Sequence, residues 1–137
     1  MTAKVGYSTP MLHVAEIEKS IAFYEHLGFV TVDTDRCQPL GWARIHCEGG
    51  AIMFLRAEGP VDHAHQVMLY TYTPDLSGLR EQLLASGLQV PPISYPGYMP
   101  SGEITLRDPD GNIILVGHWG KCEQEAWEKR ISGKTAT

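Results

Sequence analysis

The chain has 137 residues and a formal net charge of −5, with 43% hydrophobic and 20% charged residues. A chain of this length forms one compact domain and buries roughly two-thirds of the surface of its unfolded state, so disulfides are not needed to hold a core. The lysines and arginines are scattered and form no basic stripe, which argues against nucleic acid as a partner.

Cysteine spacing and hydropathy indicate the cellular compartment in which the protein is expected. The three cysteines, Cys37, Cys47 and Cys122, form no C-x-x-C pair, so neither a disulfide framework nor a zinc knuckle is expected. The first residues lack the pattern of a signal peptide, and no apolar run reaches the roughly 20 residues of a membrane span. We therefore expect a cytoplasmic protein that does not enter the membrane.

The first half of the chain predicts one helix among four strands. Apolar residues at helical spacing and the acidic Glu16 and Glu18 predict a helix from Glu16 that ends at Gly28. Runs of strand-forming residues predict strands near residues 6–14, 29–34, 41–48 and 51–56.

The second half repeats this pattern. Asp75, a strong helix N-cap, lies 59 residues after Glu16, and Gly87 lies 59 residues after Gly28. Strands are predicted near residues 66–73, 88–91, 103–107 and 112–118. An internal repeat of this length defines the architecture, so we expect an α+β fold of two tandem βαβββ modules, about 5–60 and 64–120.

Two further segments have their own character. The stretch 91–102 is rich in proline and glycine, which predicts a loop. Its Tyr95, Tyr98 and Met99 form either a lid over the cavity or incidental aromatic and apolar residues of an exposed loop, and the lid is favoured. A short helix is predicted after Gly120, followed by a frayed tail. We thus expect a single domain over residues 1–120 and a C-terminal appendage over 121–137.

Three stretches carry a resemblance to a known family. These are "EKSIAFYEHLGF" (residues 18–29), "DLSGLREQLLASG" (75–87) and "LRDPDGNIIL" (106–115). In its tandem repeat the chain resembles the vicinal oxygen chelate superfamily, which includes glyoxalase I, extradiol dioxygenases, and fosfomycin- and bleomycin-resistance proteins. The resemblance covers residues 5–119 and implies a curved, mostly antiparallel sheet around an open cavity, in which binding or chemistry takes place.

The resemblance also implies four positions for metal ligands. Metal-dependent members place His or Glu early in the first strand and within the last strand of each module. In this sequence those positions fall at Thr9, Met68, Leu115 and, by the offset between the two closing hairpins, at or within one residue of Phe54. None of these four residues or their neighbours offers an imidazole or a carboxylate. We therefore expect no metal and no cofactor.

Strand alternation extends these four positions into a set of cavity residues. Side chains two residues apart share one face of a strand, so Met11 and His13 accompany Thr9, and Tyr70 and Tyr72 accompany Met68. The expected ligand-binding residues are Thr9, Met11, His13, Trp42, Phe54, Met68, Tyr70, Tyr72, Tyr98 and Leu115. An apolar, aromatic lining of this kind is typical of a pocket for a small apolar or aromatic molecule.

The histidines and tyrosines also have structural interpretations. His13 is either a hydrogen-bonding group or base for a ligand, or a half-buried histidine satisfied by a neighbour, and the second interpretation is favoured because no partner is evident. His63 and His65 are interpreted as a polar linker, and His118 as an edge or interface residue. Tyr70 and Tyr72 fit sheet packing and a pocket equally well.

Three functional hypotheses follow. The leading one is a metal-independent binding protein similar to the bleomycin-resistance branch, which sequesters an apolar or aromatic compound and forms a homodimer, as the resemblance implies. The alternative is a diverged lyase, isomerase or dioxygenase that uses His13 or an unrecognised metal site. A third is an interaction module whose cavity is filled by its own side chains.

Overall fold

The computed structural model describes residues 3–62, 64 and 66–135, so the predicted linker histidines His63 and His65 lie outside the described residues. The chain divides into two compact units. Unit 1 comprises the residues up to Val67 together with Arg107–Asn112, and unit 2 comprises Met68–Leu106 together with the residues from Ile113 onward. Within the described ranges, no helix is both long and apolar enough to cross a membrane.

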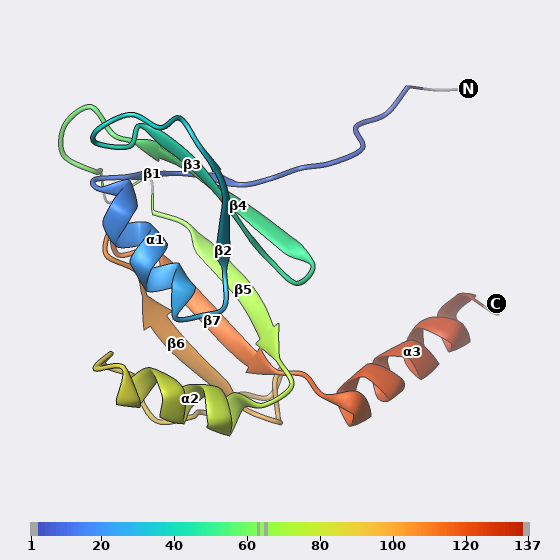
Figure 1. The fold of residues 1–137 in the computed structure, drawn as a ribbon. Helices are drawn as coiled ribbons and strands as arrows, with labels where there is room; N and C mark the ends of the chain where they lie inside the picture. Colours follow the sequence, from blue (N-terminus) through green and yellow to red (C-terminus); the bar gives the residue numbers. More distant parts are fainter. Residues whose placement is uncertain (1–2, 63, 65, 136–137) are drawn as a thin grey trace. The chain divides into compact units, whose positions relative to one another are not determined.

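Unit 1 contains a four-stranded sheet and one helix (Figure 1). Its elements are β1 (Met11–Val14), α1 (Ile17–Glu25), β2 (Val30–Thr34), β3 (Trp42–Cys47) and β4 (Gly50–Arg56). The strands lie in the order β1-β4-β3-β2; β1 and β4 are parallel, and the other neighbours are antiparallel. The predicted helix and the four predicted strands of the first module are all present.

The core of unit 1 lies between α1 and one face of this sheet. The helix buries Ile17, Phe23 and Tyr24, and the sheet buries alternate residues of β1, β3 and β4: Leu12, Val14, Ala43, Ile45, Ile52 and Phe54. The alternation that the sequence predicts therefore sorts the strands into two faces. The opposite face, which we call the helix-free face of unit 1, carries Thr9, Met11, His13, Trp42, Arg44, His46, Met53 and Leu55.

The Asp-Pro-Asp-Gly turn near the end of the chain belongs to unit 1. The buried carboxylate of Asp108 accepts hydrogen bonds from the backbone N–H groups of Asp110 and Asn112, each at 2.9 Å, and from the Asn112 amide. Gly111 has φ +85°, a conformation that glycine adopts without strain. Asp110 in turn accepts a hydrogen bond from the backbone N–H of Ala15 at 2.8 Å, which ties the turn to the entry of α1.

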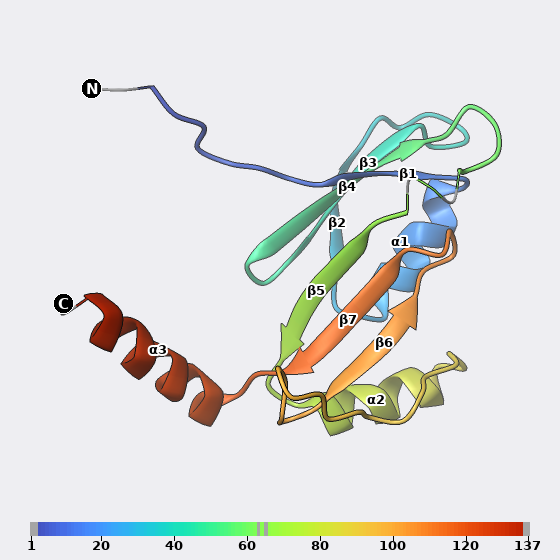
Figure 2. The ribbon, with the colours of Figure 1, turned by 180° about the vertical axis from the view of Figure 1, so that it is seen from behind.

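Unit 2 contains a three-stranded sheet and two helices (Figure 2). Its elements are β5 (Met68–Thr73), α2 (Leu76–Ala85), β6 (Glu103–Arg107), β7 (Ile113–His118) and α3 (Lys121–Thr135). The strand order is β5-β7-β6; β5 and β7 are parallel, and β6 and β7 run in opposite directions. The core beneath α2 is apolar: Leu76, Leu83, Ile104, Leu106, Ile114 and Val116. Asp75 caps α2 as predicted, because its side chain accepts a hydrogen bond from the backbone N–H of Gly78 at 3.0 Å.

Two predictions for unit 2 were wrong. The strand expected near 88–91 is absent, since Pro91 and Pro92 supply no N–H to a ladder, and a single bridge between Ser94 and Glu103 stands in its place. The terminal helix runs to Thr135, so residues 132–135 are helical rather than frayed. The α+β class with two βαβββ-type modules is confirmed, and both sheets are mixed because each has one parallel pair.

Candidate ligand-binding site

The face of the unit 2 sheet away from α2 brings four of the predicted site residues together. Met68, Tyr70 and Tyr72 alternate along β5, and Tyr70 pairs with Leu115 on β7. Met68 and Tyr72 are exposed, whereas Tyr70 and Leu115 are half-buried.

A row of three aromatic rings crosses this face. The ring centroids of Tyr70 and Tyr72 lie 5.1 Å apart, and those of Tyr72 and Trp119 lie 5.7 Å apart with an edge-to-face geometry. Trp119 directly follows β7, and its backbone N–H donates to the Thr73 carbonyl at 2.7 Å, which fixes it beside β5. Edge-to-face and tilted pairs at these distances are the arrangements that aromatic rings prefer.

The row ends in a cleft of about 380 Å³ lined by Tyr72, Trp119, Gln124 and Trp127. Trp127 comes from α3, and 41% of it remains exposed. The indole N–H of Trp119 donates to the Gln124 side chain at 2.7 Å, so the polar edge of the ring is satisfied and its apolar faces line the cleft. Pockets for small molecules commonly have volumes of roughly 300 to 1,000 Å³ and a mostly apolar lining.

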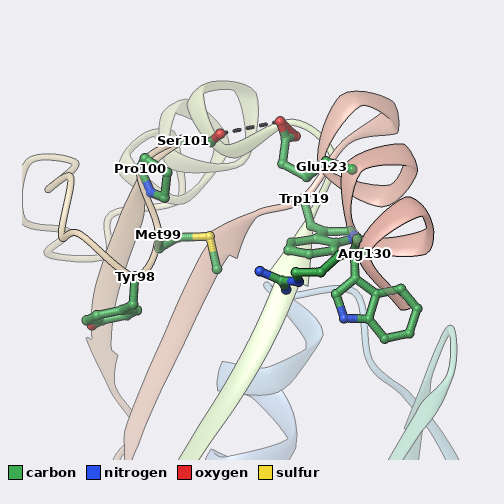
Figure 3. Close-up of a pocket in the computed structure, with 9 residues that line it drawn as sticks. Tyr98, Met99, Pro100, Ser101, Trp119, Glu123 and Arg130 are labelled. Carbon is green, nitrogen blue, oxygen red and sulfur yellow. Dashed lines mark hydrogen bonds between the residues drawn. The ribbon is translucent and has the colours of Figure 1, made fainter. Parts of the chain in front are cut away.

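A second cleft of about 240 Å³ shares Trp119 and Trp127 with the first. Figure 3 shows its two walls: Tyr98, Met99, Pro100 and Ser101 of the long loop on one side and α3 on the other. A hydrogen bond of 3.3 Å from the Ser101 hydroxyl to Glu123 joins the walls. Glu123 also accepts the backbone N–H of Gly120 at 2.7 Å, and this bond is the main cause that lowers the pKa of its carboxyl.

Glu103 organises the tyrosines of this site. Its side chain lies on β6, is 5% exposed and accepts hydrogen bonds from the hydroxyls of Tyr70 and, at 2.9 Å, Tyr98. Burial and the hydrogen bond to Glu103 raise the pKa of Tyr70, and the hydrogen bond to Glu103 raises that of Tyr98. Both hydroxyls are therefore held as neutral donors.

Gly117 leaves the room that Tyr70 needs. A Cβ atom at this position would lie 2.9 Å from the Tyr70 hydroxyl oxygen and 2.9 Å from the Met99 methyl group. Because Gly117 has no side chain, the Tyr70 ring can lie directly over its backbone and reach Glu103. Sequence reasoning missed Glu103, Gly117, Trp119 and Trp127; the charged Glu103 inside a predicted strand was the available signal.

The predicted residues of unit 1 divide into three groups. Met11, His13 and Trp42 lie on the helix-free face, where Met11 pairs with Met53 and His13 and Trp42 with Leu55. Thr9 accepts a hydrogen bond from Arg44 at 3.3 Å. Phe54, however, is fully buried on the helix side, with its ring centroid 5.4 Å from that of Tyr24.

The assignment of Phe54 to the cavity was therefore wrong. It came from a hairpin offset that was uncertain by one residue, and a slip of one residue moves a side chain to the other face of a strand. Met53 and Leu55 take the place that was assigned to Phe54.

The side chains at the four expected metal positions do not fit a divalent ion. Phe54 and Leu115 are hydrocarbons, Met68 offers only a thioether, and the Thr9 hydroxyl is engaged by Arg44. The described residues also include no group of three or more His, Cys, Asp or Glu side chains placed to hold an ion. His118, the predicted edge histidine, is half-buried beside Glu123 at 3.5 Å.

Two modules of the βαβββ type, each a mixed sheet with a helix on one face, define the protein as α+β with an internal repeat. Residues 6–116 match the Glyoxalase/Bleomycin resistance protein/Dioxygenase superfamily, and the chain belongs to this superfamily. The predicted resemblance is thereby confirmed.

Solved structures with the same fold include two proteins linked to bleomycin. A bleomycin-binding protein complexed with bleomycin is 22% identical, with a TM-score of 0.67 over 84% of this chain and 99% of that chain. The bleomycin resistance determinant encoded on the transposon Tn5 is also 22% identical, with a TM-score of 0.67 over 85% of this chain and 99% of that one.

The fold is also similar to that of a fosfomycin resistance protein. FosX from Listeria monocytogenes is 14% identical, with a TM-score of 0.65 over 89% of this chain and 99% of that chain. A comparison with curated protein sequences finds no relative. At these identities the likeness establishes the fold, and the ligand must be argued from the site itself.

Proposed function

We propose that this protein binds a small apolar or aromatic molecule without a metal ion and sequesters it, with no bond broken. The observation that carries the proposal is the aromatic row of Tyr70, Tyr72 and Trp119, which leads into the cleft completed by Trp127. These rings provide flat apolar area, and hydrogen bonds to Glu103 and Gln124 hold Tyr70 and Trp119 in place.

Pre-organisation supports binding as the role of this row. Glu103 holds the Tyr70 and Tyr98 hydroxyls, and Gln124 holds the Trp119 indole N–H. A ligand that stacks here finds rings whose freedom is already restricted, so less conformational entropy is lost when it binds. The ligand is held chiefly by ring faces, and the polar edges of the rings keep their partners within the protein.

Donor chemistry disfavours the metal-dependent alternative. A lyase, isomerase or dioxygenase of this superfamily would need imidazole or carboxylate ligands at positions where this chain has Thr9, Met68 and Leu115. The described residues include no group of three or more His, Cys, Asp or Glu side chains placed to hold an ion, and the hydrogen-bond partners of Glu103 are tyrosine hydroxyls.

The proposal is tested by adding candidate ligands to the protein and monitoring its tryptophan fluorescence. The first probe is bleomycin, which a structurally similar protein binds, followed by a panel of planar aromatic compounds. We expect saturable quenching by at least one probe, with binding weakened about tenfold or more in Trp119→Leu and Trp127→Leu. Each of these changes removes a face of the cleft together with its stacking contact, and a tenfold loss corresponds to about 1.4 kcal/mol.

Trp42→Phe is the matched control. Trp42 lies in unit 1 and lines neither cleft, so this variant should bind uncharged aromatic probes as the unchanged protein does. No saturable binding by any probe, or equal losses in all three tryptophan variants, would refute the aromatic cleft as the site.

A homodimer is part of the proposed function. Its support is apolar exposure near the start of the chain, where Val5 is 85% and Tyr7 95% exposed. Light scattering on the purified protein should give twice the mass of one chain, 15.2 kDa, and Val5→Ser combined with Tyr7→Ser should reduce it to that of one chain. A chain that is monomeric at all concentrations would contradict the dimer and leave the aromatic cleft untouched.

A further inference from the structure

We infer that the helix-free face of unit 1 contains an anion-binding site centred on Arg44, which takes the carboxylate or phosphate group of a small organic molecule. The site lies in unit 1 and does not depend on the aromatic cleft of unit 2.

The guanidinium of Arg44 is fixed by two neutral acceptors. Its Nε donates to Nε2 of His46 at 2.8 Å, and its Nη2 donates to the hydroxyl of Thr9 at 3.3 Å. Because His46 accepts at Nε2, its imidazole is neutral with the proton on Nδ1. Neither acceptor compensates the positive charge, and the described part of the chain supplies no carboxylate in an ion pair with Arg44.

The direction of the side chain is set by the strand order. Arg44 pairs with Asp33 on β2 and with Met53 on β4, and β1 lies beyond β4. Thr9 lies two residues before β1, so the hydrogen bond from Arg44 to Thr9 carries the Arg44 side chain over β4 and away from Asp33. Ala51, the β4 residue opposite His46, has only a methyl group and leaves room for this path.

The hydrogen bonds leave one edge of the guanidinium free. An arginine has five N–H donors, and Arg44 uses the one on Nε and one on Nη2. The remaining donors, two on Nη1 and one on Nη2, lie at the outer edge of the guanidinium, where Nη1 and Nη2 are side by side. This edge matches two oxygens of a carboxylate or phosphate in a paired hydrogen-bond geometry.

The surroundings favour an anion attached to an apolar body. Met11 and Met53 pair with each other beside Arg44, and His13 and Trp42 lie on the same face. Arg44 is half-buried, so its charge is less screened by water than that of a freely exposed arginine. The titratable or charged groups on this face near Arg44 are His46, His13 and Asp33, and Asp33 is the one acidic group among them.

Nuclear magnetic resonance on the full, nitrogen-15-labelled chain tests this site. The probes are benzoate, inorganic phosphate, and benzamide as the uncharged counterpart of benzoate. We expect benzoate and phosphate to shift the Arg44 side-chain Nε–Hε signal and the amide signals of Thr9 and His46 in a saturable way, with benzoate the tighter. Benzamide should leave these signals unchanged.

Three variants separate the site from a general charge effect. Arg44→Met should weaken benzoate binding at least tenfold, and Arg44→Lys should give an intermediate loss because it keeps the charge without the fork. Arg56→Met is the matched control: Arg56 lies on β4 with the parity of buried Phe54, so it is not on this face, and the variant should bind normally.

Melting temperatures of all variants show whether each is folded. Equal losses in Arg44→Met and Arg56→Met, or benzamide shifts as large as those of benzoate, would overturn the Arg44 site. If Trp119→Leu no longer bound aromatic ligands but still bound benzoate, the Arg44 site would stand. The two binding sites would then be shown to be separate.

Discussion

The hydroxyl of Tyr24 donates a hydrogen bond to Oδ2 of Asp108 at 2.8 Å, and both side chains are buried. This bond joins the only tyrosine of α1 to the Asp-Pro-Asp-Gly turn, although 84 residues separate the two in sequence. Asp108 also accepts three hydrogen bonds from within its own turn. The turn is therefore part of the core of unit 1 as well as a connection between strands.

Removing this bond should lower stability. We expect Tyr24→Phe to reduce the free energy of unfolding by about 1 to 3 kcal/mol, because a buried carboxylate loses one donor and no water replaces it. Urea denaturation measures the effect. Tyr95→Phe, in an exposed loop position, is the control and should change stability by less than about 0.5 kcal/mol. Equal stability of the two variants would contradict a structural role for the Tyr24 hydroxyl.

Alkaline pH should act on the same bond. Burial, followed by the charge and hydrogen bond of Asp108, raises the pKa of Tyr24 well above the ordinary value of about 10. Above that pH the unfolded chain loses the phenol proton while the folded chain keeps it, so the unfolded state binds fewer protons and stability falls as pH rises. The stability that this tyrosine contributes is thus complete below about pH 10.

The size of this effect follows from linkage. Because of Tyr24, the free energy of unfolding should fall by about 1.4 kcal/mol for each pH unit above about 10. Urea denaturation at several values between about pH 9 and 11 measures the slope. In Tyr24→Phe the slope should be shallower by that amount, and identical slopes in the two proteins would contradict the assignment.

The sequence predicted the elements well because their signals are local. Asp75 caps α2, Gly28 follows α1 with φ +92°, and the alternation along β5 places Met68, Tyr70 and Tyr72 on one face, as expected. Caps, glycine conformations and strand parity depend on neighbours within a few residues. They can be read without knowledge of the fold.

The site was predicted less completely because its key contacts are remote in sequence. Glu103 meets Tyr70, 33 residues away, and Tyr72 meets Trp119 across two parallel strands. A lone acidic residue in a strand pattern looks solvent-exposed until its partners are known. Phe54 was misplaced for a related reason: its face depended on a hairpin offset, and a shift of one residue reverses the face.

Gly117→Ala tests how tightly Tyr70 is seated. The new methyl group would meet the Tyr70 hydroxyl and the Met99 methyl at 2.9 Å, so Tyr70 must move off Glu103 or the strand must shift. Such overpacking costs typically about 1 to 3 kcal/mol, and any aromatic ligand of the cleft should bind more weakly. Urea denaturation and the fluorescence titration measure the two effects.

Gly97→Ala is the control for this change. A Cβ at Gly97 meets nothing within 4 Å and its φ is not positive, so this variant should keep full stability and binding. If Gly117→Ala lowered neither stability nor binding, Tyr70 would have a second position of equal energy.

Glu103→Gln tests the electrostatic part of the tyrosine arrangement. Its carboxylate raises the pKa of both Tyr70 and Tyr98, so replacing the charge with a neutral amide should lower both pKa values toward about 10. Ultraviolet titration of the phenolate band measures this. Glu81→Gln, at an exposed position of α2, should leave the titration curve unchanged.

Divalent metal ions should leave the protein unaffected. A site that holds an ion at 100 times its dissociation constant stabilises the folded state by about 2.7 kcal/mol, which raises the melting temperature of a chain of this size by roughly 5 to 12 °C. The side chains of Thr9, Phe54, Met68 and Leu115 provide no imidazole or carboxylate for such an ion. We therefore expect Mn²⁺, Ni²⁺ or Zn²⁺, and equally removal of ions by a chelator, to change the melting temperature by less than about 1 °C. A stoichiometric ion in protein purified without chelator, together with a melting temperature that falls on its removal, would return the metal-dependent alternative to first place.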